Sequence, residues 1–355
     1  MFKVLQMGRG LGALAVALFH LSLAFNDSRF GMSEDFLRWM RLGQHRVEFF
    51  FALSGFIILY AHWKDVDQPA VLGKFYVKRT LRLYPLFWIA VAFVGLKDLV
   101  SHNASVPPMG QLFSNLTLIK WVPGIPSIMP VWTLFHEIFF CGVFSLLILR
   151  RKIGVVALWA WVLAIIFLSS EFPENIHAGF FDVMVNPINL CFVGGMGAFF
   201  IYRHVPAEHS PWLIASGLCV LAVALTGTTQ HDDILAFYSL MSLGIGLLLG
   251  GAIGLERLGK VRNIPPLVFL GNASYSIYLF HVPMLLGILK FADRYKIKTF
   301  LGIPFLFVLT FCLVIVLCVL VHFYIEKPLN RLISKFVGTG KKPEPQRVAE
   351  LGAAR

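Results

Sequence analysis

The chain has 355 residues, of which 57% are hydrophobic and 14% charged, and its mean hydropathy is +0.75. Because several apolar runs reach the length that crosses a bilayer, this composition excludes a water-soluble domain and predicts a polytopic membrane protein. The net charge of +12 comes from Lys and Arg spread over short loops. Nucleic-acid binding is therefore not expected, since it requires basic residues gathered on one face.

Apolar runs separated by turn residues and charges predict an all-α protein with about ten transmembrane helices. The positive-inside rule favours both termini in the cytoplasm, because most Lys and Arg, including those of KRTLR and RRK, then lie at cytoplasmic helix ends. Residues 1–330 are expected to form one transmembrane domain, and residues 331–355 a polar, disordered cytoplasmic tail. The expected spans lie near 8–26, 46–62, 81–100, 129–149, 153–170, 186–202, 211–227, 234–255, 266–290 and 301–325.

The first expected span, GRGLGALAVALFHLSLAF, contains Arg9 and His20, eleven positions apart. In a helix this spacing is about three turns, so both side chains lie on one face with their Cα atoms roughly 16 Å apart. An ionisable side chain in mid-bilayer costs about 2.5–3.5 kcal/mol even on the gentler insertion scales, and such residues are therefore candidates for function. His20 is the candidate base of this span.

Glu48 lies in the second expected span, RVEFFFALSGFIILY, which runs in the opposite direction. It therefore reaches a depth similar to that of His20. A carboxylate paired with the imidazole would orient the ring and raise its basicity, as a general base near neutral pH requires. The alternative is a polar bridge between helices with no chemical role.

A cationic cluster precedes the third span in YVKRTLRLYP. Arg79 and Arg82 are three residues apart on one helical face, with Lys78 beside them and Arg9 expected at the same membrane level. Guanidinium groups in this arrangement suit phosphate binding. The alternative is that these residues only anchor the topology of the chain.

Glu137 lies two turns into the fourth span, in PVWTLFHEIFF, behind Pro130. A lone carboxylate in a membrane span must be protonated, paired or functional, and we expect function. Glu137 is thus a second candidate partner of His20. The cysteines all lie in apolar runs without zinc-ligand spacing, so no metal site is expected.

Several motifs together resemble the acyltransferase-3 family of integral membrane acyltransferases. They are the Arg9 to His20 spacing, EFFFALSGF, RTLR, PVWTLFHE, LGNASYSIYLFHVPML and FYIEKPLNRL, in the family's order. Many members have Asp where Glu48 stands, and another residue where His136 stands, which leaves the role of His136 open. His281 also fits the pattern, and we expect it to serve helix packing.

The resemblance implies transfer of an acyl group, commonly acetyl, from cytoplasmic acyl-CoA to a hydroxyl of an extracytoplasmic or lipid-linked polysaccharide. It implies a multi-pass protein of the bacterial cytoplasmic (inner) membrane. The expected partners are acyl-CoA, a carbohydrate acceptor and the lipid bilayer, with a separate polysaccharide-assembly protein as a further alternative. No permanently bound cofactor is expected, because acyl-CoA is the donor substrate.

In this interpretation Arg9, Lys78, Arg79 and Arg82 bind the CoA phosphates. The pantetheine arm then reaches His20. Oriented by Glu48 or by Glu137, this histidine takes the proton of the acceptor hydroxyl, and a covalent acyl-histidine is the alternative mechanism.

Two other functions fit a chain with many spans and buried charges. One is a transporter of lipid-linked saccharides, although the mirrored Gly/Pro helix breaks typical of transporters are not evident. The other is a non-catalytic scaffold for polysaccharide assembly, which has no need of arginines at one membrane surface and a histidine above them. Within the family, the pattern WTLxxExFF is closer to exopolysaccharide-modifying members than to peptidoglycan-modifying ones.

Overall fold

The computed structural model describes residues 2–26, 30–33, 38–100, 108–122, 131–169, 179–227 and 233–336, and within these ranges it is helical, with no strand. This confirms the predicted all-α class.

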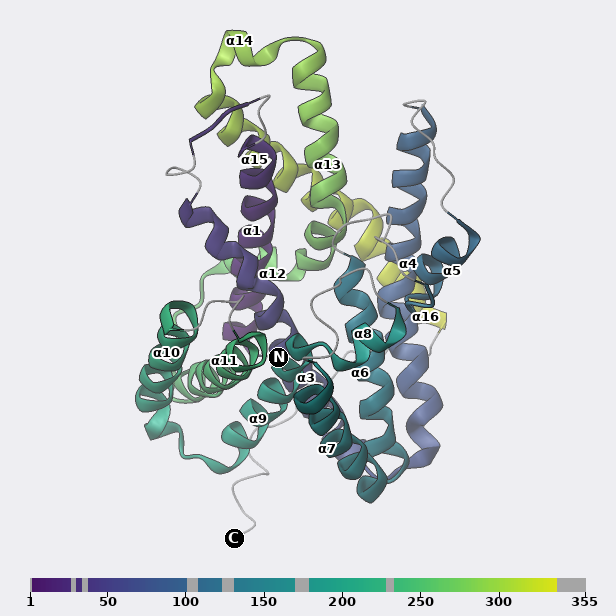
Figure 1. Cartoon of the computed structure of the whole chain (residues 1–355), viewed down its shortest axis with the longest axis vertical. Coiled ribbons are helices and arrows are strands. Elements are labelled where there is room, and N and C mark those ends of the chain that lie inside the picture. Colours follow the sequence, from purple (N-terminus) through teal and green to yellow (C-terminus); the bar gives the residue numbers. More distant parts are fainter. Residues whose placement is uncertain are drawn as a thin grey trace.

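Figure 1 shows α1 near the centre of the molecule, with α13 to α15 at one end of the long axis and α7 and α9 toward the other. The α-helices are α1 (Lys3–Asn26), α3 (Arg46–His62), α4 (Leu72–Val100), α5 (Met109–Thr117), α6 (Trp132–Leu149), α7 (Arg151–Leu168), α8 (Phe180–Val185), α9 (Leu190–His204), α10 (Ser210–Gly227), α11 (Ile234–Arg257), α12 (Pro265–Asn272), α13 (Ser274–Arg294), α14 (Ile297–Leu301), α15 (Ile303–Val321) and α16 (Lys327–Phe336).

Nine helical segments in the described ranges are long and apolar enough to cross a membrane. The expected span near 186–202 corresponds to α9, which has 15 residues and is shorter than the roughly 20 residues that a spanning helix needs. The expected span 266–290 is divided at Ala273 into the short α12 and the longer α13. The cytoplasmic location of both termini stays a prediction.

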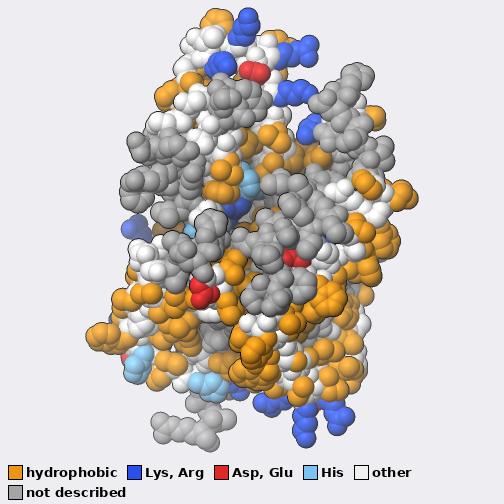
Figure 2. Space-filling model, viewed as in Figure 1, with side chains coloured by type: hydrophobic (Ala, Val, Ile, Leu, Met, Phe, Trp, Pro, Cys, Tyr) orange, Lys and Arg blue, Asp and Glu red, His pale blue; other side chains and the backbone are white. Residues whose placement is uncertain are grey.

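Large apolar side chains cover the outer surface of the helices, as a lipid-facing surface requires. Trp159 and Phe167 of α7 are 65% and 71% exposed, and Trp212 of α10 is 74% exposed. On the face shown in Figure 2, hydrophobic side chains form much of the surface in the lower half of the molecule, and Lys and Arg side chains are most numerous at the top and bottom.

Glycines allow close packing of α3 against α9. A Cβ atom on Gly195 would overlap the carbonyl oxygen of Ala52, and one on Gly55 would overlap that of Phe192. Small residues at such crossings let two helix backbones approach closely, which stabilises helix pairs in a membrane by van der Waals contact. This pair forms the centre of one apolar core, which also includes residues of α6, α7 and α11.

A second apolar core joins α1, α4, α13 and α15. α1 also crosses α12 closely, because Gly10 and Gly271 each lie against a backbone carbonyl of the other helix. Its Arg9 side chain is therefore held in the space between the two cores. At the C-terminal end, α16 continues to Phe336, past the expected domain boundary at residue 330, and residues 337–355 of the expected tail lie outside the described part.

Candidate active site

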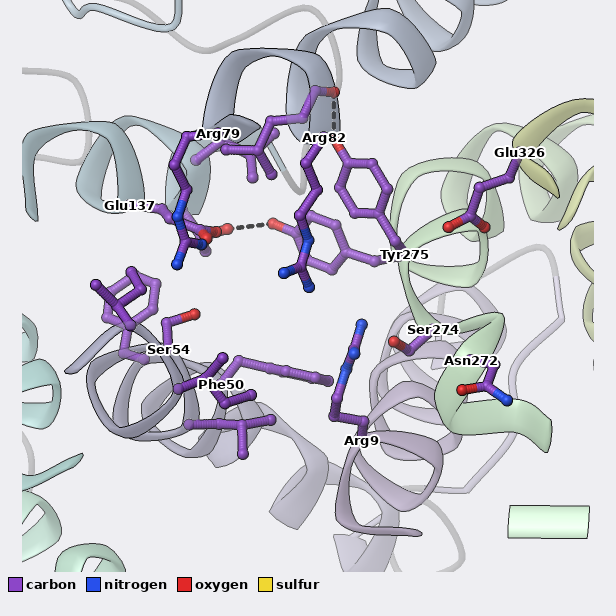
Figure 3. Close-up of a pocket in the computed structure, with 18 of the residues that line it drawn as sticks. Arg9, Phe50, Ser54, Arg79, Arg82, Glu137, Asn272, Ser274, Tyr275 and Glu326 are labelled. Carbon is purple, nitrogen blue, oxygen red and sulfur yellow. Dashed lines mark hydrogen bonds between the residues drawn. The ribbon is translucent and has the colours of Figure 1, made fainter. Parts of the chain in front are cut away.

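A cavity of about 280 Å³ lies between the two cores and is lined by charged side chains from separate helices. Arg9 comes from α1, and Arg79 and Arg82 come from adjacent turns of one face of α4. Figure 3 shows the three guanidinium groups pointing toward one another across the cavity. The convergence of these arginines, predicted from their spacing and membrane level, is present in the structure. We call this cavity the arginine pocket.

The guanidinium groups of the arginine pocket have few protein partners. Arg9 Nη1 donates a hydrogen bond to Gln6 Oε1 at 3.3 Å, and the Arg79 guanidinium lies 5.9 Å from the Phe75 ring centroid. Within the described residues, neither Arg79 nor Arg82 forms an ion pair. Three like charges that face one cavity repel each other, and an anion bound between them would remove that repulsion.

Lys78 does not line the arginine pocket, although it is adjacent to Arg79 in the chain. The Lys78 side chain is exposed, whereas Arg79 is 8% exposed. Lys78 lies about 100° from Arg79 and about 40° from Arg82 around the helix, at the edge of the face that the two arginines share. The structure therefore brings Arg9, Arg79 and Arg82 together in the arginine pocket but not Lys78, whose expected part in binding the donor stays a prediction.

Glu137 of α6 lines the arginine pocket. Figure 3 shows its carboxylate beside Arg79. In the described part of the chain no hydrogen bond or ion pair to Glu137 is formed. The structure thus puts Glu137 with the cationic groups and not in contact with His20, which differs from one of the two predicted pairings.

Glu326 is a pocket residue that the sequence analysis did not single out. It lies at the end of a π-helical turn, His322–Glu326, between α15 and α16. Its Oε2 atom accepts hydrogen bonds from Ser276 Oγ and from His322 Nδ1, both at 2.6 Å. Single π-helical turns occur frequently at functional sites. The motif FYIEKPLNRL contained this signal, because it places a carboxylate and a proline at the end of an apolar span.

Thr133 of α6 and Tyr278 of α13, which form a hydrogen bond with each other, line the arginine pocket. The same two side chains line a second cavity of about 20 Å³, together with Val16 and Arg46. This cavity has room for about one water molecule. Because Val16 is one helical turn from His20, the small cavity lies between the arginine pocket and the His20 region.

His20 contacts another histidine and neither of the predicted carboxylates. Its Nδ1 atom lies 3.0 Å from the carbonyl oxygen of Val16 and 3.1 Å from Nε2 of His281. His281, expected to serve helix packing, is thus also the polar partner of the candidate base. The structure does not bring Glu48 or Glu137, the two predicted partners, into contact with His20.

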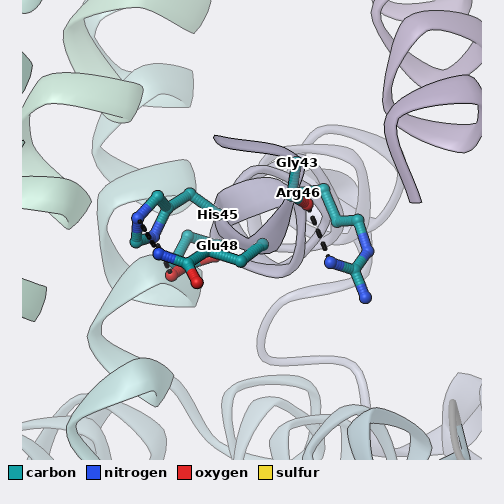
Figure 4. Close-up of polar contacts among 5 residues, drawn as sticks. Gly43, His45, Arg46 and Glu48 are labelled. Atoms are coloured by element: carbon teal, nitrogen blue, oxygen red, sulfur yellow. Dashed lines mark hydrogen bonds and ion pairs between the residues drawn. The ribbon is translucent and has the colours of Figure 1, made fainter. Parts of the chain in front are cut away.

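Glu48 pairs with His45, whose Nδ1 lies 3.2 Å from Glu48 Oε1. Figure 4 shows this pair on one side of α3 and Arg46 on the other side. Arg46 donates a hydrogen bond to the carbonyl oxygen of Gly43 and stacks on the ring of Phe19 in α1. Residues 46 and 48 differ by about 200° around the helix, so Glu48 lies on the side of α3 opposite to Arg46, which contacts α1.

His136 is buried against a different network. Its Nδ1 lies 2.9 Å from Asn189 Oδ1, and Asn189 Nδ2 donates to the carbonyl oxygen of Val183. Nearby, Lys120 and Asp182 form a buried ion pair at 3.7 Å. Burial lowers the pKa of Lys120, and the Asp182 carboxylate opposes that shift. These contacts give His136 a structural role between α6 and the α8–α9 segment.

Comparison with known proteins agrees with the motifs. The model of a family described as an acyltransferase domain matches residues 3–322. The chain is 30% identical over 258 residues to the exopolysaccharide production protein ExoZ of Rhizobium meliloti (strain 1021), a match that covers 68% of this chain and 76% of that protein. No solved structure matches the chain significantly.

Two further relatives are named as acyltransferases. The chain is 27% identical to acyltransferase MdmB of Streptomyces mycarofaciens, over 95% of this chain and 94% of that protein. It is 21% identical to peptidoglycan O-acetyltransferase OatA of Listeria monocytogenes, over 78% of this chain but only 48% of that protein. With a family match over nearly its whole length and motifs in the same order, the chain belongs to the acyltransferase-3 family of membrane acyltransferases.

Proposed function

We propose that this acyltransferase moves an acyl group, acetyl being the expected one, from cytoplasmic acyl-CoA to a hydroxyl of an extracytoplasmic or lipid-linked polysaccharide. Membership of the family supports acyl transfer. The acceptor class is supported by the printed name of ExoZ, an exopolysaccharide production protein. The localisation that follows from this reaction is the bacterial cytoplasmic membrane, with the donor site on its inner side.

The observation that carries the donor assignment is the convergence of Arg9, Arg79 and Arg82 on one cavity. CoA carries several phosphate groups, and a guanidinium group binds phosphate oxygens with paired N–H donors. These three residues have the free N–H groups that such a ligand needs. Lys78 is left out of this proposed site, because its side chain is exposed and does not line the cavity.

The thioester must travel from the arginine pocket to His20 for the transfer to occur. The route that we propose passes Thr133 and Tyr278, which line both cavities, and then the small cavity beside Val16. That cavity is too small for a pantetheine arm, so the Thr133 and Tyr278 side chains must separate when the donor binds. His20 then takes the proton of the acceptor hydroxyl as the hydroxyl oxygen attacks the acyl carbonyl.

Binding of radiolabelled acetyl-CoA to the purified protein tests the donor assignment. We expect saturable binding that unlabelled CoA displaces, because both molecules carry the same phosphates. A transporter of lipid-linked saccharides or a scaffold for polysaccharide assembly has no reason to bind CoA. Absence of saturable binding by protein that keeps its cooperative thermal unfolding would contradict the proposal.

A further inference from the structure

Two histidines from distant parts of the chain meet at the candidate base. His281 of α13 is completely buried, and its ring centroid lies 4.9 Å from that of His20 in α1. The His281 Nε2 atom lies 3.1 Å from His20 Nδ1. This distance is that of a hydrogen bond, so one of the two nitrogen atoms carries the shared proton and the other accepts it.

The backbone around His281 decides which of its nitrogens is protonated. His281 Nδ1 lies 2.8 Å from the carbonyl oxygen of Ile277 and 2.9 Å from that of Tyr278. Carbonyl oxygens only accept hydrogen bonds, so His281 Nδ1 carries the proton. A charged imidazolium is costly inside the membrane, and the neutral ring therefore presents an unprotonated Nε2 to His20.

The same reasoning fixes the proton on His20. Its Nδ1 atom faces two acceptors, the carbonyl oxygen of Val16 at 3.0 Å and Nε2 of His281. His20 Nδ1 therefore carries a proton that both acceptors share. The lone pair of the neutral ring is then on Nε2, and in the described part of the chain this Nε2 atom forms no hydrogen bond.

We propose that His281 is a positioning residue that holds His20 in the Nδ1-protonated form, so that His20 Nε2 is the base of the transfer reaction. This inference rests on the proposed function, and it adds the residue that sets the protonation state of the catalytic base. In the Ser-His-Asp arrangement a carboxylate has this task. In this protein the neutral ring of His281 holds the base in place of a carboxylate. No second charge then needs to be buried inside the membrane.

The proton path follows from this assignment. The acceptor hydroxyl gives its proton to His20 Nε2, and its oxygen forms a bond to the acyl carbonyl carbon. The carbon–sulfur bond of the thioester then breaks, and the departing sulfur takes the proton back from His20 Nε2 to give the free thiol. While His20 is charged, its Nδ1–H bond to His281 Nε2 stabilises the imidazolium.

Two substitutions of His281 separate positioning from packing. His281→Phe keeps a flat ring but offers no acceptor to His20, whereas the side-chain carbonyl of His281→Gln can accept the same hydrogen bond. We expect His281→Phe to lower kcat about 10²-fold or more, with the KM for acetyl-CoA unchanged, because the arginine pocket is separate. We expect His281→Gln to restore a large part of that loss. Equal and small effects of both substitutions on kcat would overturn the proposal.

A spectroscopic measurement tests the proton assignment without any assay of transfer. In protein with ¹⁵N-labelled histidine, NMR distinguishes protonated from unprotonated ring nitrogens, and the signals absent from His20→Ala identify His20. We expect a protonated Nδ1 and an unprotonated Nε2 in the wild-type protein. A protonated Nε2 would overturn the inference, even if His281→Phe failed to fold. If the protein transferred no acyl group at all, the proposed function would fail while this measurement still decided the pairing.

Discussion

Thr133 of α6 and Tyr278 of α13 form a hydrogen bond with each other and line both the arginine pocket and the small cavity beside Val16. The residues of the donor site and the candidate base are thus on opposite sides of one closed contact. On the proposed route this contact opens when the donor binds, because the small cavity holds about one water molecule. The donor site and the catalytic step can therefore be perturbed independently.

Enlarging the side chain at residue 133 should block the passage. We expect Thr133→Leu to lower acyl transfer about tenfold or more while binding of 3′,5′-ADP, the phosphate-bearing end of CoA, changes little. Added methyl groups cost about 1–3 kcal/mol in a packed site, so the thermal unfolding temperature is measured on the same preparation. Thr133→Ser keeps the hydroxyl and is the matched control. Normal turnover by Thr133→Leu would mean that the donor reaches His20 by another route.

Removal of a guanidinium group should weaken donor binding. Hydrogen bonds to charged groups contribute about 1.5–3 kcal/mol, so Arg79→Ala and Arg82→Ala should each raise the Kd for acetyl-CoA about tenfold or more. Equilibrium binding of the labelled donor measures this change. Lys78→Ala is the matched control, because Lys78 lies on the same helix and carries the same charge but does not line the pocket. Equal affinity of all three variants for acetyl-CoA would mean that the arginines do not bind the donor and only anchor the topology of the chain.

Substitution of Glu137 should affect the donor more than the chemical step. Its carboxylate lines the arginine pocket, where it repels phosphate, so Glu137→Gln should tighten acetyl-CoA binding by about two- to tenfold at low salt, with less effect at high salt. The kcat at saturating donor should change little, because Glu137 does not contact His20. A decrease in kcat of about 10²-fold would instead indicate that Glu137 acts as a general acid or base.

The α3–α9 crossing supports a stability prediction that is independent of chemistry. Gly195→Ala puts a methyl group into the Ala52 carbonyl, and we expect it to cost about 1–3 kcal/mol because the helices must move apart. Gly197→Ala is two residues away on the same helix, and its Cβ meets no atom within 4 Å. Thermal unfolding in detergent should therefore distinguish the two variants, and similar unfolding temperatures would show that the crossing is looser than described.

The arginine pocket could be predicted from the sequence, but the surroundings of the base could not. Arg79 and Arg82 share a helical face because of their spacing, and the topology put Arg9 at the same level. Spacing gives the depth of a residue and its direction on its own helix, but it does not say which helices are neighbours. The sequence therefore predicted Glu48 as the partner of His20, because both were expected at a similar depth. In the structure α1 packs against α13, and the partner is His281.

The break between α12 and α13 was missed for a related reason. Residues 266–290 have no charged residue before Lys290 and contain no long turn signal, so hydropathy alone predicts one span. The structure divides this segment at Ala273. The division brings Asn272, Ser274 and Tyr275 to the arginine pocket. The break coincides with Gly271, Asn272 and Ser274, residue types that favour turns and helix ends and that hydropathy alone does not register.

The acyl content of surface polysaccharide tests the central claim most directly. Mass spectrometry is applied to a deletion strain and to the same strain that produces either the wild-type protein or His20→Ala. We predict that the acyl substituent is lost on deletion, restored by the wild-type protein and absent with His20→Ala, although purified His20→Ala still binds acetyl-CoA like the wild type. A near-normal acyl content with His20→Ala would contradict the account.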